Sequence, residues 1–211
     1  MAGVRLSESL TWWMAPHPEW TPNPEWPEEV GFATWAASDA YVLIDPLVRD
    51  DLDDAAWKPF DAAIAEAGRP VGVLLTAPWH ERSARAVSAR YDAPVWIETR
   101  GKDRITGSPE LAALPNGIEA FVPEGVEEAQ VAFHIVPERT LVVADFFLGT
   151  DEGLRVLPSP ATNDLNAFMA SLDRLRELPI ERVLVAHGPS VLSVGHAAIC
   201  EALDAYERSL S

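Results

Sequence analysis

Four short apolar segments, each followed at once by polar residues, constrain the fold of this chain most. Segments of this kind are typical of strands buried on both faces of a sheet, and ligands of mixed α/β folds gather at the ends of such strands. We therefore expect the polar residues that follow the four segments to converge on one site. The pairs are 42–44 with Asp45, 71–76 with the loop 77–82, 141–144 with Asp145, and 182–186 with His187.

The spacing of apolar residues elsewhere predicts an alternation of strands and helices. Residues 31–37 and 41–46 are predicted to form two antiparallel strands, joined by a turn at Ser38 and Asp39. A helix over residues 53–67 ends at Gly68. This order favours a single α/β domain over residues 1–211, a mixed sandwich with helices on its outer faces. Further strands are expected at 94–97, 118–122, 129–136 and 140–144, and further helices at 83–91, from a cap at Thr162 or Asn163 to 178, and from Ser193 or Gly195 to 209.

A Trp- and Pro-rich N-terminal segment, about residues 10–30, departs from this pattern. Pro at this density excludes regular helix and central strand, so residues 16–27 are expected to form an irregular surface segment. Its tryptophans bury a large area wherever they pack. They form either a lid over a site or part of the packing against a sheet, and the sequence leaves both alternatives open.

The net charge of the chain limits the kinds of partner that it can bind. Its 211 residues include 16 Lys and Arg against 33 Asp and Glu, a formal net charge of −17. A nucleic-acid partner is not expected, because phosphate binding needs clustered positive charge. No membrane association is expected either, since no apolar run approaches the ~20 residues of a spanning helix and no signal peptide is recognisable. Cys200 is the single cysteine, which fits a reducing cytoplasm.

The four segments, taken in order, resemble the metallo-β-lactamase superfamily over essentially the whole chain. Residues 42–46 resemble its early strand that ends in Asp, and 74–76 lead into its ligand loop. Residues 141–145 resemble its strand ending in Gly-Asp, with Ala144 in place of Gly, and 183–188 its last strand and metal-binding His. The resemblance implies a four-layer αββα sandwich. It also implies hydrolysis by a hydroxide that bridges two metal ions, usually zinc and sometimes iron or manganese.

The resemblance further implies where the metal ligands belong. Members carry His-x-His-x-Asp-His directly after a Thr, which is Thr76 here. Two His positions of the first half-site then fall on Ala77 and Trp79, and the third falls on Val126. None of these three side chains binds a metal ion, so the resemblance implies a chain that has lost this half-site.

The second half-site keeps more of its chemistry. Glu81 stands at the Asp position, Asp145 at the bridging carboxylate and His187 at the last His. Two carboxylates and an imidazole can hold a single ion, as in some iron and zinc sites. Arg82 replaces the remaining ligand; it is always charged and shaped for carboxylates. We expect Arg82 to pair with Glu81, Asp145 or both in place of a cation.

Two neighbouring residues also have candidate roles. His80 lies one place outside the ligand register. It is expected either to face the pocket as an acid or base near neutral pH, or to lie on the surface at a helix start. Asp45 is expected to support the ligand loop by hydrogen bonding from beneath.

Two functions therefore compete. In the first, the chain has a depleted metal site and no cofactor, and it binds a small molecule or a protein partner at the residual pocket. In the second, it hydrolyses ester- or thioester-like substrates, with a metal-free site or one Zn, Fe or Mn ion held by Glu81, Asp145 and His187. The candidate catalytic residues are His80, Glu81, Arg82, Asp145 and His187, one serving as general base and Arg82 stabilising an oxyanion. The sequence leaves the substrate and the oligomeric state open.

Overall fold

Two β-sheets form the centre of the fold. The structure, a computed structural model, describes residues 2–22, 26–48, 54–104 and 112–210. The first sheet begins with an antiparallel meander and continues with parallel strands. Its strands, in spatial order, are β1 (Ala2–Arg5), β2 (Leu10–Pro16), β3 (Glu29–Ala36), β4 (Tyr41–Ile44), β5 (Val71–Leu74) and β6 (Val95–Trp96).

The second sheet is built mainly from the second half of the chain. A separate hairpin of β10 (Phe147–Thr150) and β11 (Gly153–Val156) extends beyond it. The four strands of the sheet, in spatial order, are β12 (Arg182–Val185), β9 (Thr140–Val143), β8 (Ala132–Ile135) and β7 (Ile118–Phe121).

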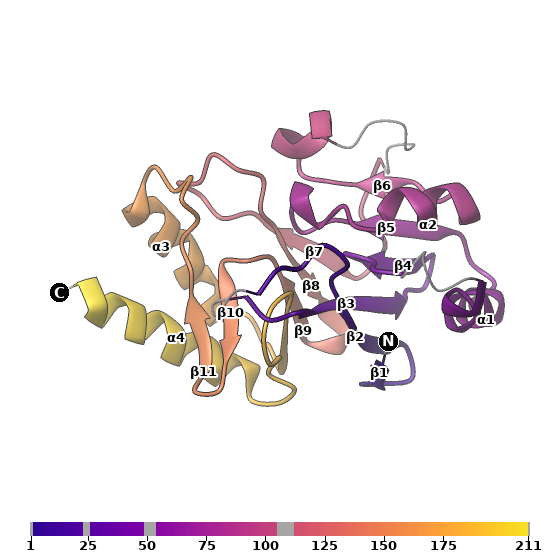
Figure 1. Ribbon diagram of the computed structural model, residues 1–211. Helices are drawn as coiled ribbons and strands as arrows, with labels where there is room; N and C mark the ends of the chain where they lie inside the picture. The colour runs from indigo at the N-terminus through magenta and orange to yellow at the C-terminus, as the bar shows by residue number, and fades with distance from the viewer. Residues whose placement is uncertain (1, 23–25, 49–53, 105–111, 211) are drawn as a thin grey trace.

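The helices cover the outer faces of the two sheets. Figure 1 shows α1 and α2 beside the first sheet, and α3 and α4 beside the second. Gly68 ends α1 in a left-handed conformation, with φ of 61°, as its lack of a Cβ allows. The helices are α1 (Lys58–Ala67), α2 (Ala84–Tyr91), α3 (Leu165–Asp173) and α4 (Gly195–Leu210).

Three apolar cores separate four layers. Phe60 belongs to the core between α1, α2 and the first sheet. Phe133 belongs to the core between the two sheets, where Trp12 and Trp35 also pack. Phe168 belongs to the core between the second sheet and α3 and α4. Each element thus buries one face or stripe, and the result is the predicted four-layer αββα sandwich.

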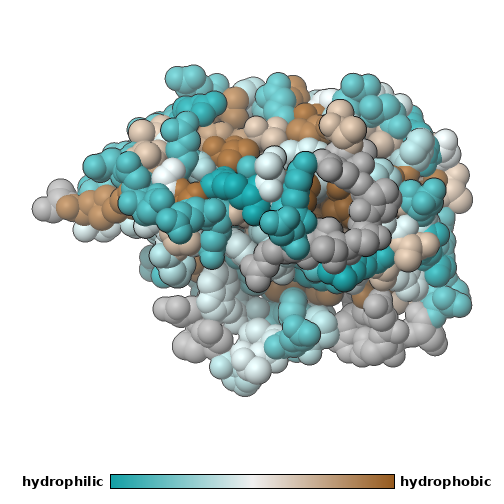
Figure 2. Space-filling model, turned by 90° about the horizontal axis from the view of Figure 1, so that it is seen from above, coloured by the Kyte–Doolittle hydropathy of each residue, from teal (hydrophilic) through white to brown (hydrophobic). Residues whose placement is uncertain are grey.

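Hydrophilic side chains cover much of the face seen in Figure 2, with smaller apolar areas between them. The sequence supplies such side chains, since 23% of its residues are Asp, Glu, Lys or Arg. Within the described residues, no helix is long and apolar enough to cross a membrane.

The parallel pairs of strands bring the site together. Ile44 of β4 pairs with Leu74 of β5, and Val143 of β9 pairs with Val185 of β12. The carboxyl ends of the strands within each pair therefore meet at one edge. Two main-chain hydrogen bonds tie the sheets together there, from Val131 N to Thr76 O at 2.8 Å and from Gly31 N to Ala186 O at 2.8 Å.

Most predicted elements are confirmed, and four details differ. Residues 10–16, the start of the Trp/Pro-rich segment, form strand β2, which pairs with β3. The cap of α3 is Asp164, whose side chain accepts a hydrogen bond from Ala167 N, so the predicted cap at Thr162 or Asn163 is wrong. The β10–β11 hairpin was not predicted. Residue 53, the predicted start of the first helix, lies outside the described residues; that helix begins at Lys58 after a 3₁₀ turn over Asp54–Ala56.

Candidate functional site

Polar side chains from four strand ends converge, as the sequence predicted. Asp45 follows β4, His80 lies in the short 3₁₀ turn Pro78–His80 beyond β5, Asp145 lies two residues beyond β9, and His187 lies two residues beyond β12. His80 Nδ1 lies 3.0 Å from Asp45 Oδ2, and His80 Nε2 lies 3.2 Å from Asp145 Oδ1. His187 Nε2 lies 3.6 Å from the same oxygen of Asp145. The site is thus a chain of alternating carboxylates and imidazoles.

Asp45 and Thr76 fix the orientation of His80 from beneath. Asp45 accepts hydrogen bonds from Thr76 N, at 2.8 Å, and from the Thr76 hydroxyl. His80 Nδ1 lies 2.8 Å from Thr76 Oγ1 as well as facing Asp45. A carboxylate that holds one ring nitrogen directs the other, here Nε2, toward Asp145. Asp45 therefore has the supporting geometry that the sequence suggested.

His80 carries a buried positive charge when no metal is bound. The residue is 2% exposed and lies between two carboxylates. Burial alone would lower the pKa of His80, but the charges of Asp145 and Asp45 outweigh it and raise the pKa to about 9. Of the two predicted positions, the surface one is wrong, because His80 is buried and faces Asp145.

Asp145 is the centre of the cluster. Burial alone would raise the pKa of its carboxyl, but His80, His187 and the Trp79 indole together hold that pKa well below its ordinary value. Trp79 Nε1 donates to Asp145 Oδ2 at 2.7 Å. The other oxygen, Oδ1, lies at ion-pair distance from both imidazoles but makes no aligned hydrogen bond to a described residue. Asp145 thus has one satisfied oxygen and one oxygen open to a further donor.

His187 closes the other side of the cluster and is neutral at pH 7. Burial lowers its pKa to about 4; the charge of Asp145 opposes this effect, and the charges of His80 and Arg82 add to it. The Trp26 ring packs edge-on against the His187 ring, with centroids 4.6 Å apart. The tryptophans of the N-terminal segment therefore divide: Trp12 packs in the core between the sheets, and Trp26 covers one side of the site.

Glu81 and Arg82 do not form the predicted pair. The Glu81 carboxylate forms an ion pair with Arg85, one turn along the chain, and is not part of the group formed by His80, Asp145 and His187. Arg82 instead donates to two main-chain carbonyls, Gly31 O at 2.9 Å and Asp45 O at 3.1 Å. Burial lowers the pKa of Arg82, and the nearby charges of Asp45 and Asp145 oppose this effect. Arg82 therefore adds positive charge to the cluster without a direct ion pair to either expected carboxylate.

The three substituted ligand positions are filled by apolar packing and an indole. Ala77 and Val126 are buried members of the core beneath α3 and α4. Trp79 is 38% exposed, and its indole N–H, the one donor of its side chain, bonds to Asp145. At the three positions where the resemblance implies histidine ligands, these side chains offer no metal ligand.

The donor set that remains fits a single metal ion. His80, Asp145 and His187 each offer one ligand atom, and these atoms lie within 4.8 Å of one another. His80 Nε2 and Asp145 Oδ1 are buried atoms with no hydrogen-bond partner among the described residues, as ligand atoms awaiting an ion would be. Two imidazoles and a carboxylate suit zinc, iron or manganese. This set differs from the one predicted from the sequence, because His80 takes the place of Glu81.

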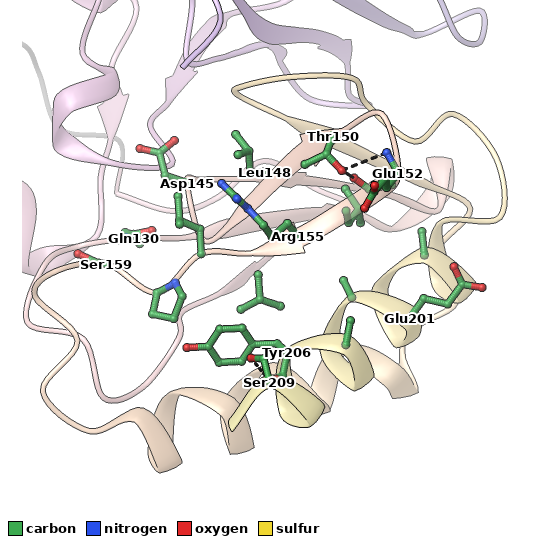
Figure 3. A pocket seen from close by; sticks show the side chains of 18 of the residues that line it. Gln130, Asp145, Leu148, Thr150, Glu152, Arg155, Ser159, Glu201, Tyr206 and Ser209 are labelled. Atoms are coloured by element: carbon green, nitrogen blue, oxygen red, sulfur yellow. Dashed lines mark hydrogen bonds between the residues drawn. The ribbon is translucent and has the colours of Figure 1, made fainter. Parts of the chain in front are cut away.

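A groove of about 1400 Å³ opens beside the cluster, and we name it the hairpin groove. Trp26, Trp79, Glu128, Gln130 and Asp145 are among the residues that line it. The rest of its lining comes from the β10–β11 hairpin, the segment 157–160 and α4, and Figure 3 shows these walls facing one another. The groove borders the cluster through Asp145.

Comparison with known proteins identifies the class of fold. No family model matches the sequence, and no curated protein matches it. Solved structures match over nearly the whole chain, and they show that the chain has the metallo-β-lactamase fold. At 11–16% identity the likeness concerns the fold alone.

Three of these structures illustrate the likeness. The DIM-1 metallo-β-lactamase has a TM-score of 0.71 at 14% identity, with 99% of this chain and 97% of that chain covered. VMB-1, in a crystal structure at pH 5.5, has a TM-score of 0.68 at 11% identity, with 100% and 98% covered. A metallo-β-lactamase from Pontibacter korlensis has a TM-score of 0.66 at 16% identity, with 96% and 98% covered.

Proposed function

We propose that this metallo-β-lactamase-fold chain binds a small molecule in the hairpin groove and has no dinuclear metal chemistry. The observation that carries the proposal is the state of Asp145. The residue expected to bridge two metal ions instead accepts the Trp79 indole on one oxygen and faces two imidazoles with the other. Trp79 stands at one of the three positions that the resemblance assigns to the first half-site. The other two are Ala77 and Val126, and both are packed in an apolar core.

The charges of the cluster support a site that is stable without metal. Asp45 and Asp145 contribute two negative charges, and the His80 imidazolium and Arg82 contribute two positive charges. Unpaired buried carboxylates would be costly, and these cations offset that cost. A cluster balanced in this way needs no divalent ion for its folding.

Metal content and ligand binding together test this proposal. Purified protein, prepared without chelator and offered Zn, Fe and Mn in turn, is measured by inductively coupled plasma mass spectrometry. We expect fewer than two ions per chain under every condition. Two ions per chain, with hydrolysis that depends on both, would refute the proposal. A library of small molecules screened by thermal shift is expected to yield hits that are lost when Gln130 is replaced by Leu.

A second candidate function is a hydrolase with one metal ion, and the open atoms of His80 and Asp145 favour it. His80, Asp145 and His187 would hold the ion, which would supply an activated water for ester or thioester hydrolysis. Asp45 would hold His80 in the metal-binding tautomer, and Arg82 would add positive charge to the site. Near-unit metal stoichiometry that is lost in His187→Ala and kept in His196→Ala would support it. His196 is a suitable control because it lies on α4 and bonds to the Arg176 carbonyl.

The remaining functional inferences rest on the sequence. We propose a cytoplasmic location because Cys200 is the single cysteine, which fits a reducing compartment. A nucleic-acid partner is not proposed, because a net charge of −17 would repel it.

A further inference from the structure

The hairpin groove contains more acidic than basic side chains. Glu128, Asp145, Asp151, Glu152 and Glu201 line it, against Arg155 and Arg208. Except for Asp145, these acidic residues are exposed, so their charges act on a ligand as it enters the groove. Clefts lined by one sign of charge concentrate ligands of the opposite sign. The charge of the groove therefore favours a cationic ligand.

Gln130, at the same end of the groove as Asp145, provides an independent observation about the ligand. The residue is 2% exposed, directly precedes Val131 at the junction of the two sheets, and lines the groove. Its Oε1 is a buried acceptor with no hydrogen-bond partner among the described residues. A buried acceptor without a partner destabilises the fold, and a ligand that brings an N–H donor would remove this cost. A donor, rather than another acceptor, is therefore the group that fits here.

Apart from Arg155, much of the wall between the two polar ends is apolar. Leu148, Leu157 and Ala202 come from the hairpin, the following segment and α4, and Tyr206 adds an aromatic face. In Figure 3, Gln130 and Asp145 lie at one end of the groove, and Glu152 and Glu201 at the other. A ligand that meets both ends must be elongated and mainly aliphatic between its polar groups.

We propose that the hairpin groove binds an elongated aliphatic amine, with one N–H donor at Gln130 and a cationic group near Glu152 and Glu201. Trp26 and Trp79 also line the groove, and an ammonium group is attracted to aromatic faces of this kind. The inference rests on the proposed function, that this pocket binds a small molecule, and specifies the chemical class of that molecule.

Arg155 distinguishes the proposed cationic ligand from an anionic one. It projects from β11 in the groove lining, and Figure 3 shows it between the two ends. For a cationic ligand Arg155 is a repulsive neighbour, whereas for a carboxylate it would be the main attraction. Removing its charge therefore has opposite effects on the two classes of ligand.

Isothermal titration calorimetry with a series of matched length tests the proposal. Diaminooctane, octanediol and octanedioate share one aliphatic chain and differ in charge. We expect diaminooctane to bind, octanediol to bind more weakly and octanedioate not to bind. Glu152→Gln combined with Glu201→Gln should weaken diamine binding about fivefold, since partly exposed charge pairs are worth little each. Gln130→Leu should weaken it on the order of tenfold, because a hydrogen bond to a charged group is lost. Arg155→Gln should strengthen it.

A control variant and the alternative outcomes complete the test. Glu66→Gln removes an exposed acid on α1, which packs on the other sheet, and should leave the affinity unchanged. Circular dichroism establishes that each variant is folded. If octanedioate binds and Arg155→Gln abolishes that binding, the amine proposal is overturned but small-molecule binding in the pocket stands. If no member of the series binds while the thermal-shift library still yields hits that Gln130→Leu abolishes, the amine proposal is overturned and small-molecule binding stands. If the library yields no such hits either, both proposals are overturned.

Discussion

Replacing His80 by Gln tests the central claim that a buried imidazolium balances Asp45 and Asp145. The pKa of His80 is about 9 in the folded protein, against 6.5 for a histidine without these interactions. Because the folded pKa is the higher one, the interaction stabilises the fold fully below pH 6.5 and is lost as pH rises through about 9. The interval between the two values corresponds to ~3 kcal/mol of unfolding free energy.

The measurement is urea-induced unfolding of both proteins at intervals from pH 6 to pH 10, in the presence of a chelator. Between the two pKa values the free energy of unfolding of the unmodified protein should fall by about 1.4 kcal/mol per pH unit relative to His80→Gln. Comparing the two proteins at each pH removes the contributions of other titrating groups. At pH 7 the variant should be ~3 kcal/mol less stable, and above pH 9 the difference should nearly disappear.

Parallel stability curves for the two proteins would refute this reasoning. They would mean that His80 is neutral across the range and that Arg82 alone offsets the two carboxylates. Proton NMR of the imidazole, which reports the pKa of His80 directly, would then give a value near or below 6.5. A variant that is less stable by the same amount at every pH would indicate a packing role for His80 without a charge.

Three further predictions concern neighbouring residues and the metal. His187 has a folded pKa of about 4, below its ordinary value, so stability should fall as pH drops from 6.5 toward 4; His187→Gln should flatten this acid limb in urea unfolding. Thr76→Val removes a hydroxyl that contacts buried Asp45 and His80, and should lower the unfolding free energy by about 1–3 kcal/mol. If the mononuclear site forms, zinc must displace the proton on His80, so zinc affinity should rise up to tenfold per pH unit below about 9 in calorimetric titrations; an affinity independent of pH would contradict that ligand assignment.

The convergence of the site could be predicted from the sequence because it depends on strand ends. Residues 42–44 and 141–144 are continuous apolar runs, and the chain must leave the sheet where polar residues follow. Parallel pairing of β4 with β5 and of β9 with β12 then places Asp45 and Asp145 at the same edge as their neighbours. None of this depends on the details of side-chain orientation.

The orientation of individual loop residues could not be predicted in the same way. Glu81 was placed inward by family register, but the 3₁₀ turn Pro78–His80 directs His80 inward and leaves Glu81 beside Arg85. A 3₁₀ turn has about three residues per turn, so a shift of one residue changes the direction of a side chain by about a third of a turn. Arg82 adopts a left-handed backbone, with φ of 41°, which is uncommon for Arg and has no signal in the sequence.

The β10–β11 hairpin was missed although the sequence contains a signal for it. Asp151, Glu152 and Gly153 separate two short runs that begin at Phe147 and Leu154, and Gly153 has φ of 120°. A short connection that contains Gly between such runs is typical of a β-hairpin. The hairpin matters because it forms one wall of the groove, so the dimensions of the groove could not be inferred without it. Gln130 was missed for a different reason, since a single buried amide has no periodic pattern.

The two candidate functions depend on one equilibrium at His80 Nε2. In the absence of metal this nitrogen carries a proton, and the resulting imidazolium offsets the charge of Asp145 at 3.2 Å. A metal ion would need the same nitrogen and the same Asp145 oxygen, so proton and metal exclude each other. If Ala77 and Val126 stand at positions of the first half-site, as we propose, that half-site offers no ligand to a metal ion. Arg82 adds a second cation that opposes its entry. The same fold can therefore keep the geometry of a metal centre while a proton on His80 supplies the positive charge. Whether His80 Nε2 carries a proton or binds a metal ion thus decides between the two functions.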